Sequence, residues 1–278
     1  MLRVDLHCHS TASDGTFSPR DLVKLAKFHN LAALGLCDHD TVDGLKEFFQ
    51  AGRDLNFQVL GGVELSLEYK GITHLLGLGV KSQGLFPESL EVVKDYRMER
   101  NRKLLERLAE VGVNLSWERL LEISAGGQMG RPHFARALCE AGYCHDLPEA
   151  FDRYLAKGRP TYVNKIRPSP SKALAILRQS GFAPVLAHPI SLKISADQFE
   201  KAMPDWLDWG LIGIEAYHPD QSPEFSQFIV RLCKKFKLVA TAGSDYHGAN
   251  KKTPLNWVNH HSPFGLQVID ELTRAMEA

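Results

Sequence analysis

Short apolar runs typical of buried strands alternate with helical patterns at both ends of this chain, and this alternation restricts its possible folds. Strands are expected at 3–9, 31–37, 59–67, 72–80, 183–187, 211–217 and 238–243. Helices are expected at 18–30, 42–55, 171–180, 223–236 and 265–276. Strands that alternate with helices favour a parallel α/β sheet, either open or closed into a barrel.

The block from residue 85 to residue 162 has a different character. Helices are expected within it at 91–111, 118–123, 133–141 and 147–155, followed by a short strand at 160–163. We interpret this block as a helical insertion. The chain is therefore expected to divide into a first α/β part (1–84), a helical insertion subdomain (85–162) and a second α/β part (163–278).

Acidic residues and histidines gather where the expected strands end. Functional residues of parallel α/β folds collect at the carboxyl ends of the strands. Each of the strands expected outside the insertion has such a side chain at or near this edge: His7 and His9, Asp38 and His39, Glu64, His74, His188, His218, and Asp245 and His247. Solvated loop residues would point in unrelated directions, so the repetition in every strand favours one shared site.

The run Asp5-Leu6-His7-Cys8-His9-Ser10 indicates the chemistry of that site. Successive side chains of a strand point to opposite faces, so Asp5, His7 and His9 share one face. Two imidazoles on a rigid element, with a carboxylate behind them, form half of a metal site.

Bulk composition excludes several classes of function. The chain balances 33 Lys and Arg against 33 Asp and Glu, which disfavours binding to long nucleic acid. It has neither an apolar run of the ~20 residues that span a bilayer nor a signal-peptide pattern, so no membrane association is expected. Five cysteines without a CxxC pair argue against a thiolate zinc site and for a reducing, cytoplasmic location.

The motifs taken together resemble those of a known family. The matching pieces occur in the family's order and are Asp5–Ser10, Ser13-Asp14-Gly15, Asp38-His39-Asp40-Thr41, Gly62-Val63-Glu64, His188-Pro189 and Gly243–His247. They resemble the polymerase-and-histidinol-phosphatase (PHP) family of metal-dependent phosphoesterases. The resemblance implies a distorted seven-stranded β/α barrel with two or three divalent ions at its mouth.

The resemblance also implies a set of metal ligands. The first metal would be held by His7, His9, Glu64 and Asp245, and Glu64 would bridge to a second metal completed by His74 and His188. The third would be held by Asp14, His39 and His247. Mixed imidazole and carboxylate ligands suit Mn²⁺, Fe²⁺ or Zn²⁺. Asp5 and Asp38 are better placed to orient ligand imidazoles than to bind metal.

The insertion carries candidate substrate-binding residues. A glycine-rich loop at 126–130 leads into Arg131-Pro132-His133, and a helix N-terminus beside Arg131 and His133 can bind phosphate. Lys157 and Arg159 form a second basic cluster, with Tyr162 behind it. The alternative is an ordinary capped helix with surface charge. His218 is a candidate to contact the scissile phosphate or protonate the leaving group, and a structural loop histidine is the alternative.

The Arg-Pro-His segment within a helical insertion resembles the PHP subgroup that acts on 3′,5′-nucleotide bisphosphates and on short RNA 5′ ends. The resemblance therefore predicts an enzyme, a phosphatase of a small nucleotide such as a nucleoside 3′,5′-bisphosphate, which uses a metal-activated hydroxide. The first alternative is a 5′-to-3′ exoribonuclease on short RNA. A histidinol-phosphate phosphatase and a non-catalytic PHP module are less favoured, the latter because every expected ligand is present.

Overall fold

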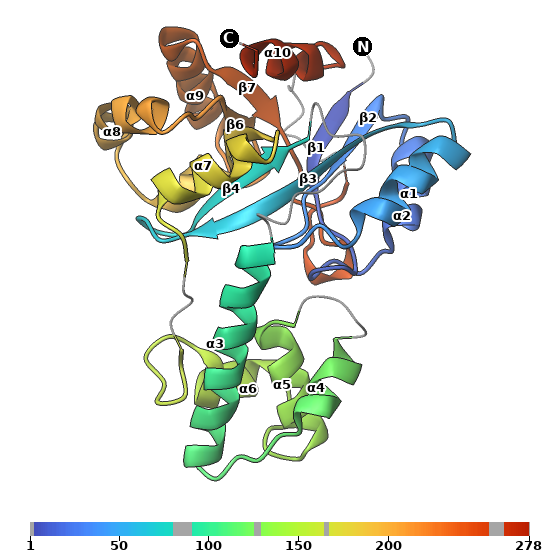
Figure 1. The fold of residues 1–278 in the computed structure, drawn as a ribbon, viewed down its shortest axis with the longest axis vertical. Coiled ribbons are helices and arrows are strands. Elements are labelled where there is room, and N and C mark those ends of the chain that lie inside the picture. Colours follow the sequence, from blue (N-terminus) through green and yellow to red (C-terminus); the bar gives the residue numbers. More distant parts are fainter. Residues whose placement is uncertain (1–2, 80–90, 125–128, 164–166, 256–263, 278) are drawn as a thin grey trace. The chain divides into compact units, whose positions relative to one another are not determined.

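The fold is known from a computed structural model, which describes residues 3–79, 91–124, 129–163, 167–255 and 264–277 (Figure 1). The chain forms two compact units. Met1–Leu90 and Pro168–Ala278 together make the first, and Glu91–Arg167 makes the second. No helix in the described residues is long and apolar enough to cross a membrane.

The first unit is built on a seven-stranded sheet whose strands follow one another in chain order. The strands are β1 (Val4–Cys8), β2 (Ala33–Leu36), β3 (Gln58–Leu67), β4 (Thr73–Leu78), β5 (Ala183–Leu186), β6 (Gly213–Tyr217) and β7 (Val239–Ala242). An isolated parallel bridge joins Cys8, the last residue of β1, to Tyr246, which follows β7, and so connects the two edges of the sheet. The sheet therefore nearly closes, and the predicted distorted seven-stranded β/α barrel is confirmed.

The sheet is not parallel throughout, which corrects the sequence-based expectation. β4 runs antiparallel to both β3 and β5, whereas the other neighbours are parallel. Only residues 68–72 separate β3 from β4, and a parallel connection needs a dozen residues or more. Gly71 lies in this turn with φ +59°, and a Cβ there would come within 2.3 Å of the Ser191 carbonyl oxygen. Only glycine fits this position.

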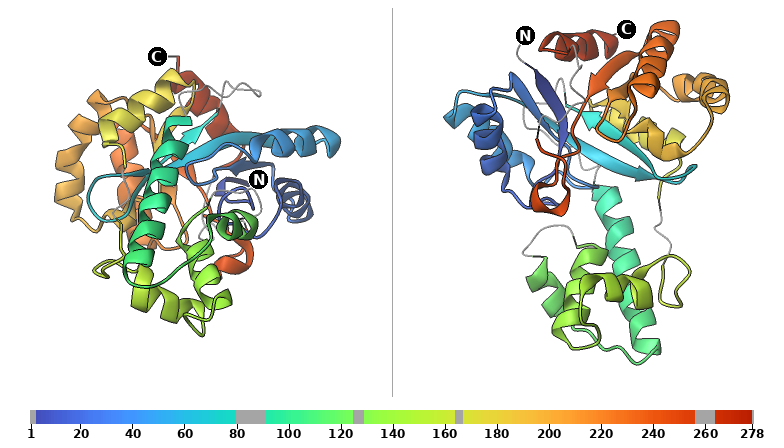
Figure 2. Two further views of the ribbon diagram at one scale, coloured as in Figure 1. Left: turned by 60° about the horizontal axis from the view of Figure 1, so that its bottom comes forward. Right: turned by 180° about the vertical axis from the view of Figure 1, so that it is seen from behind.

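Helices cover the outside of the barrel (Figures 1 and 2). They are α1 (Pro19–Phe28), α2 (Leu45–Asp54), α7 (Pro170–Gln179), α8 (Ala196–Asp208), α9 (Pro223–Phe236) and α10 (Gln267–Ala275), with 3₁₀ turns η3 (Pro189–Leu192) and η4 (Gly248–Asn250). The sequence analysis did not predict α8. The sequence does contain a signal for the start of this helix, a capping box in which the side chains of Ser195 and Gln198 each bond the other's backbone N–H. Pro204 interrupts the helical pattern of the residues that follow.

Apolar packing among the described residues holds the barrel together. Val4 and Leu6 of β1 pack with Val268 and Leu272 of α10, which closes the amino-terminal end of the barrel. A second cluster joins α1 and α2 to the outer faces of the first strands. These clusters lie at one end and on the outside of the barrel, whereas buried polar side chains gather at the opposite mouth.

The second unit is helical and has an apolar core of its own. It contains α3 (Glu91–Glu110), α4 (Trp117–Ile123), α5 (Arg131–Glu140), α6 (Leu147–Ala150) and a π-helical turn η2 (Phe151–Leu155). The strand predicted at 160–163 was wrong. The Tyr162 N–H bonds to the Arg159 carbonyl in a turn, and the described residues of this unit contain no strand with which the segment could pair.

Candidate metal centre

Nine polar side chains from six strands and their following loops meet at the mouth of the barrel. They are His7, His9, Asp14, His39, Glu64, His74, His188, Asp245 and His247, the set that the resemblance implies. The sequence analysis placed His74 near the carboxyl end of its strand. In the structure it lies at the start of β4. Because β4 is antiparallel, its start lies at the same edge as the carboxyl ends of its neighbours.

Glu64 lies at the centre of this group and is fully buried. Its Oε2 lies 2.8 Å from His39 Nδ1, 3.2 Å from His9 Nε2 and 3.5 Å from His7 Nε2. Its Oε1 faces another pair of imidazoles, at 2.8 Å from His74 Nδ1 and 2.9 Å from His188 Nε2. One carboxylate therefore presents its two oxygens to two separate sets of nitrogen ligands.

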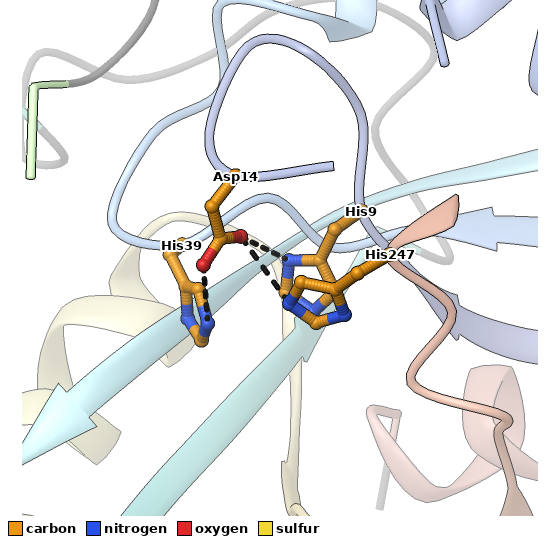
Figure 3. A group of neighbouring side chains, drawn as sticks. All are labelled: His9, Asp14, His39 and His247. Carbon is orange, nitrogen blue, oxygen red and sulfur yellow. Dashed lines mark ion pairs between the residues drawn. The ribbon is translucent and has the colours of Figure 1, made fainter. Parts of the chain in front are cut away.

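A further group surrounds Asp14, in the loop between β1 and α1 (Figure 3). Its carboxylate lies 3.2 Å from His247 Nε2 and 3.8 Å from both His39 Nε2 and His9 Nδ1. His9 thus faces Glu64 and Asp245 with one ring nitrogen and Asp14 with the other. Its ring lies between two candidate metal positions.

Hydrogen bonds fix the direction in which three of the imidazoles face. Nδ1 of His7 lies 3.1 Å from Glu215 Oε1, Nδ1 of His247 lies 2.8 Å from the Asp245 carbonyl oxygen, and Nδ1 of His188 lies 2.9 Å from Ser191 Oγ. Carbonyl and carboxylate oxygens only accept, and the Ser191 hydroxyl donates to carbonyl oxygens. In the neutral rings Nδ1 therefore carries the hydrogen, and Nε2 presents a lone pair to the carboxylates.

Imidazole nitrogens and carboxylate oxygens crowd together in the middle of the cluster, an arrangement that fits a cation. Nε2 of His7 and Nε2 of His9 are 3.1 Å apart. Buried atoms without a well-formed hydrogen bond among the described residues include His9 Nδ1, His39 Nδ1, Glu64 Oε2 and Asp245 Oδ1. Such atoms are costly unless something positive binds them, and imidazole with carboxylate is a suitable donor set for divalent transition metals.

The pKa shifts in the cluster also favour a bound cation. Burial raises the pKa of Glu64, but the neighbouring imidazoles of His39, His74 and His7 outweigh it and hold the carboxyl pKa well below its usual value. Burial also lowers the pKa of His7, yet the charges of Glu215, Glu64 and Asp245 raise it above 6.5. Carboxylates that draw protons onto buried imidazoles also attract a metal, which displaces those protons when it binds.

His74 differs from His7. Burial lowers the pKa of His74 to about 4, despite the charge of Glu64. Its ring is therefore neutral at pH 7, which is the protonation state that a metal ligand requires.

The backbone is strained at three of these strand ends. His188 has φ +25°, and Asp40 and Asp245 each have φ +51°. Residues other than glycine adopt positive φ at a cost of about 1–3 kcal/mol, and such residues cluster at functional sites. The strain after β2, β5 and β7 indicates that the surrounding structure holds these turns in place for their side chains.

Asp5 and Asp38 hold the backbone around the cluster. Asp5 Oδ1 accepts the N–H of Ser244 at 2.9 Å and that of His7 at 3.3 Å. Asp38 accepts the N–H and the hydroxyl of Ser10, both at 2.7 Å, and the hydroxyl of Ser13 at 2.5 Å. These contacts secure the loops that carry His9, Asp14 and Asp245.

Glu215, in the middle of β6, is a functional residue that the sequence analysis missed. Its side chain is fully buried; Oε1 contacts His7 Nδ1, and Oε2 accepts the His188 N–H at 2.7 Å. Gly243, which directly follows β7, leaves room for it, because a Cβ at this position would lie 2.4 Å from Oε1. A carboxylate enclosed in the apolar run Ile214-Glu215-Ala216 was the available signal.

We expect Glu215→Gln to weaken metal binding by roughly 10- to 100-fold, the usual effect of losing a group that orients a metal ligand. Glutamine has one acceptor oxygen, so its amide N–H₂ must face either His7 Nδ1–H or the His188 N–H. A metal titration monitored by calorimetry measures the change, and the exposed Glu224→Gln in α9 is the control. Unchanged metal affinity in a folded Glu215→Gln protein would contradict the role.

His218 lies beside the same cluster. Its side chain is almost fully buried, and Nε2 lies 3.6 Å from Asp245 Oδ2 with no well-formed hydrogen bond among the described residues. Nδ1 accepts the Asp220 N–H at 3.2 Å, so the neutral ring carries its hydrogen on Nε2. The ring thus has an N–H that can donate a hydrogen bond near the candidate metal ligands.

The candidate substrate-binding residues of the second unit have the following partners. Arg131 donates from Nη1 to the Leu155 carbonyl at 3.3 Å, and its guanidinium lies 5.7 Å from the ring centroid of Tyr162. His133 Nδ1 accepts the Gly130 N–H at 2.9 Å and so caps α5. Arg159 pairs with Asp152, and Lys157 is exposed. Residues 126–128 of the glycine-rich loop and the boundary at 84/85 lie outside the described residues.

Comparison with known proteins supports a family assignment. A family model described as PHP domain matches residues 5–156. The 5′-3′ exoribonuclease of Haemophilus influenzae is 31% identical over 258 residues, covering 92% of each chain. The 3′,5′-nucleoside bisphosphate phosphatase of Chromobacterium violaceum is 29% identical over 250 residues, which cover 89% of this chain and 88% of that protein.

Two further similarities extend over nearly the whole chain. The phosphoribosyl 1,2-cyclic phosphate 1,2-diphosphodiesterase of Eggerthella lenta is 32% identical over 259 residues, covering 90% of this chain and 96% of that protein. The crystal structure of a proposed metal-dependent phosphoesterase from Bifidobacterium adolescentis superposes with a TM-score of 0.80 at 25% identity, covering 99% of this chain and 96% of that one. The chain therefore belongs to the PHP domain family of metal-dependent phosphoesterases.

Proposed function

We propose that this enzyme removes a phosphate from a small nucleotide such as a nucleoside 3′,5′-bisphosphate. The observation that carries the proposal is the arrangement of Glu64, whose two oxygens face two sets of imidazole nitrogens at 2.8–3.5 Å. Closely spaced metal positions with a shared carboxylate suit hydrolysis of a phosphate ester. The Chromobacterium relative, named a 3′,5′-nucleoside bisphosphate phosphatase, supports the substrate class.

The proposed ligands are the nine residues at the barrel mouth. His7, His9, Glu64 and Asp245 would hold one ion, and Glu64, His74 and His188 a second. Asp14, His39 and His247 would hold a third. Bound divalent ions lower the pKa of a water molecule and neutralise phosphate oxygens. The chain's own part is to orient the imidazoles through Glu215 and backbone oxygens, and to donate a hydrogen bond from Nε2 of His218 to an oxygen of the substrate phosphate.

A second candidate function is 5′-to-3′ cleavage of short RNA. The observation that favours it is the similarity to the Haemophilus exoribonuclease over 92% of both chains. The same cluster would serve either reaction, since both hydrolyse a phosphate ester. Substrate preference would then depend on how the remainder of the nucleotide or oligonucleotide is held.

One experiment separates these functions. The metal-loaded protein is assayed at equal concentrations of a nucleoside 3′,5′-bisphosphate, a 5′-phosphorylated oligoribonucleotide, a ribose 1,2-cyclic phosphate and histidinol phosphate. The proposal predicts the highest kcat/KM for the bisphosphate, with release of inorganic phosphate. A higher kcat/KM for the oligonucleotide, with release of mononucleotides, would establish the second function instead.

We expect Arg131→Lys to lower kcat/KM for the bisphosphate by roughly 10- to 100-fold, because a planar guanidinium binds a phosphate better than an ammonium does. This corresponds to about 1.5–3 kcal/mol for one charge-assisted contact. An aryl phosphate, which has no second phosphate, should be hydrolysed almost as before. The control is Arg136→Lys, an exposed residue of the same helix. An equal loss of kcat/KM for both substrates would show that Arg131 has a structural role and does not bind the second phosphate.

A further inference from the structure

Lys251 is a cationic residue beside the metal centre that the family motifs do not include. Its Nζ forms an ion pair with Asp245 Oδ2, and its side chain is 43% exposed. The other oxygen of Asp245, Oδ1, lies 3.1 Å from His9 Nε2 and 3.6 Å from His7 Nε2. Asp245 thus faces the candidate metal ligands with one oxygen and the ammonium group of a partly exposed lysine with the other.

The loop that carries Lys251 is anchored on both sides. The Ala249 N–H donates to Thr16 Oγ1 at 2.9 Å, and Asn250 Nδ2 donates to the Asp14 carbonyl at 2.7 Å. Gly248 has φ +66°, and a Cβ there would come within 2 Å of Thr16 Oγ1, so the loop packs tightly against the loop of Asp14. These contacts hold the Lys251 backbone beside the metal centre.

The position of Lys251 suits it to bind an anion that approaches the metal centre. An ammonium group has three N–H donors, and one ion pair with Asp245 does not exhaust them. His218 Nε2 lies 3.6 Å from the same Asp245 oxygen and carries the ring hydrogen, so two donors converge there. The Lys251 side chain is partly exposed, whereas that of His218 is buried.

We propose that Lys251 is a phosphate-binding residue of this active site, whose ammonium group contacts a non-bridging oxygen of the scissile phosphate. The inference rests on the proposed function for its substrate, but phosphate binding itself can be measured without turnover. Because the contact is to the scissile phosphate, every phosphate-ester substrate should depend on Lys251. In this respect Lys251 would differ from Arg131, which we assign to the second phosphate.

The test uses the metal-loaded protein and inorganic phosphate as the probe. Calorimetry measures the Kd of phosphate for wild type, Lys251→Gln, Lys251→Arg and the neighbouring exposed control Lys252→Gln. We expect Lys251→Gln to raise this Kd, and the KM of both bisphosphate and aryl phosphate, by roughly 10- to 100-fold. Lys251→Arg should stay within about threefold of wild type, since it keeps the charge.

Measuring the metal content of each variant distinguishes phosphate binding by Lys251 from an indirect effect of its charge on metal binding by Asp245. Removing a cation beside a metal ligand should leave metal affinity unchanged or raise it, so a weaker phosphate affinity at full metal occupancy supports the proposal. An unchanged phosphate Kd in Lys251→Gln, or an equal change in Lys252→Gln, would overturn it. If the bisphosphate is not hydrolysed but the phosphate Kd still rises, the substrate assignment fails and the role of Lys251 stands.

Discussion

Glu64→Gln should reduce the rate of phosphate release by roughly a hundred- to a thousand-fold or more. A loss of this size is expected when the metal ions no longer stabilise the transition state by several kcal/mol. Glutamine keeps the shape of the side chain but removes the negative charge that faces both sets of imidazoles. At one of those sets, the amide N–H₂ would present a hydrogen-bond donor in the place of a carboxylate oxygen. The protein should also bind fewer metal ions per chain.

The control for this variant is Glu68→Gln, which changes an exposed glutamate next to the end of the same strand. Elemental analysis gives the metal content, and a melting curve confirms that the variant is folded. Near-native turnover of Glu64→Gln at full metal occupancy would contradict the assignment of Glu64 as the shared ligand.

Removing the metal should lower the melting temperature clearly. Ligands that bind only the folded state stabilise it by RT ln(1 + [L]/Kd), which is about 4 kcal/mol at a thousand-fold excess over Kd. For a chain of this size that corresponds to roughly 8–16 °C. The proposed ligands follow strands from both ends of the chain, so a bound cluster ties β1 to β7 as well as to the strands between them.

Differential scanning calorimetry before and after treatment with a chelator measures this shift, with metal loss verified by elemental analysis. Glu64→Gln is the matched comparison and should show a much smaller shift, because it binds less metal at the outset. A chelator effect of the same size in both proteins would show that the stabilising metal lies elsewhere. An unchanged melting curve of the stripped wild type would contradict a multi-strand cluster.

The barrel and its polar mouth could be predicted because both follow from local patterns. The alternation of apolar runs with capped helices gives the elements, and His, Asp and Glu at their ends mark one edge. The direction of β4 could also be read from the short link at 68–72, which leaves no room for a crossover helix. The sequence-based interpretation passed over that link when it inferred a parallel sheet.

Contacts between distant residues could not be predicted in the same way. The carboxylate that orients His7 belongs to Glu215, which is 208 positions away, and nothing in the chain near His7 indicates it. Lys251 reaches Asp245 because Gly248 turns the loop back, which depends on a positive φ at that residue. The strand prediction for 160–163 was wrong for a related reason: its β-branched and aromatic residues suit a strand, but the described residues of its unit contain no partner strand.

Metal reconstitution tests the central claim most directly. Protein stripped by a chelator is titrated with Mn²⁺, Fe²⁺ or Zn²⁺ while bound metal and phosphate release from a nucleoside 3′,5′-bisphosphate are measured on the same samples. We predict no turnover in the stripped protein and activity that rises with metal and saturates at two or three ions per chain. Full activity in the stripped protein, or saturation with a single ion, would contradict a phosphoesterase centred on a carboxylate shared between ions.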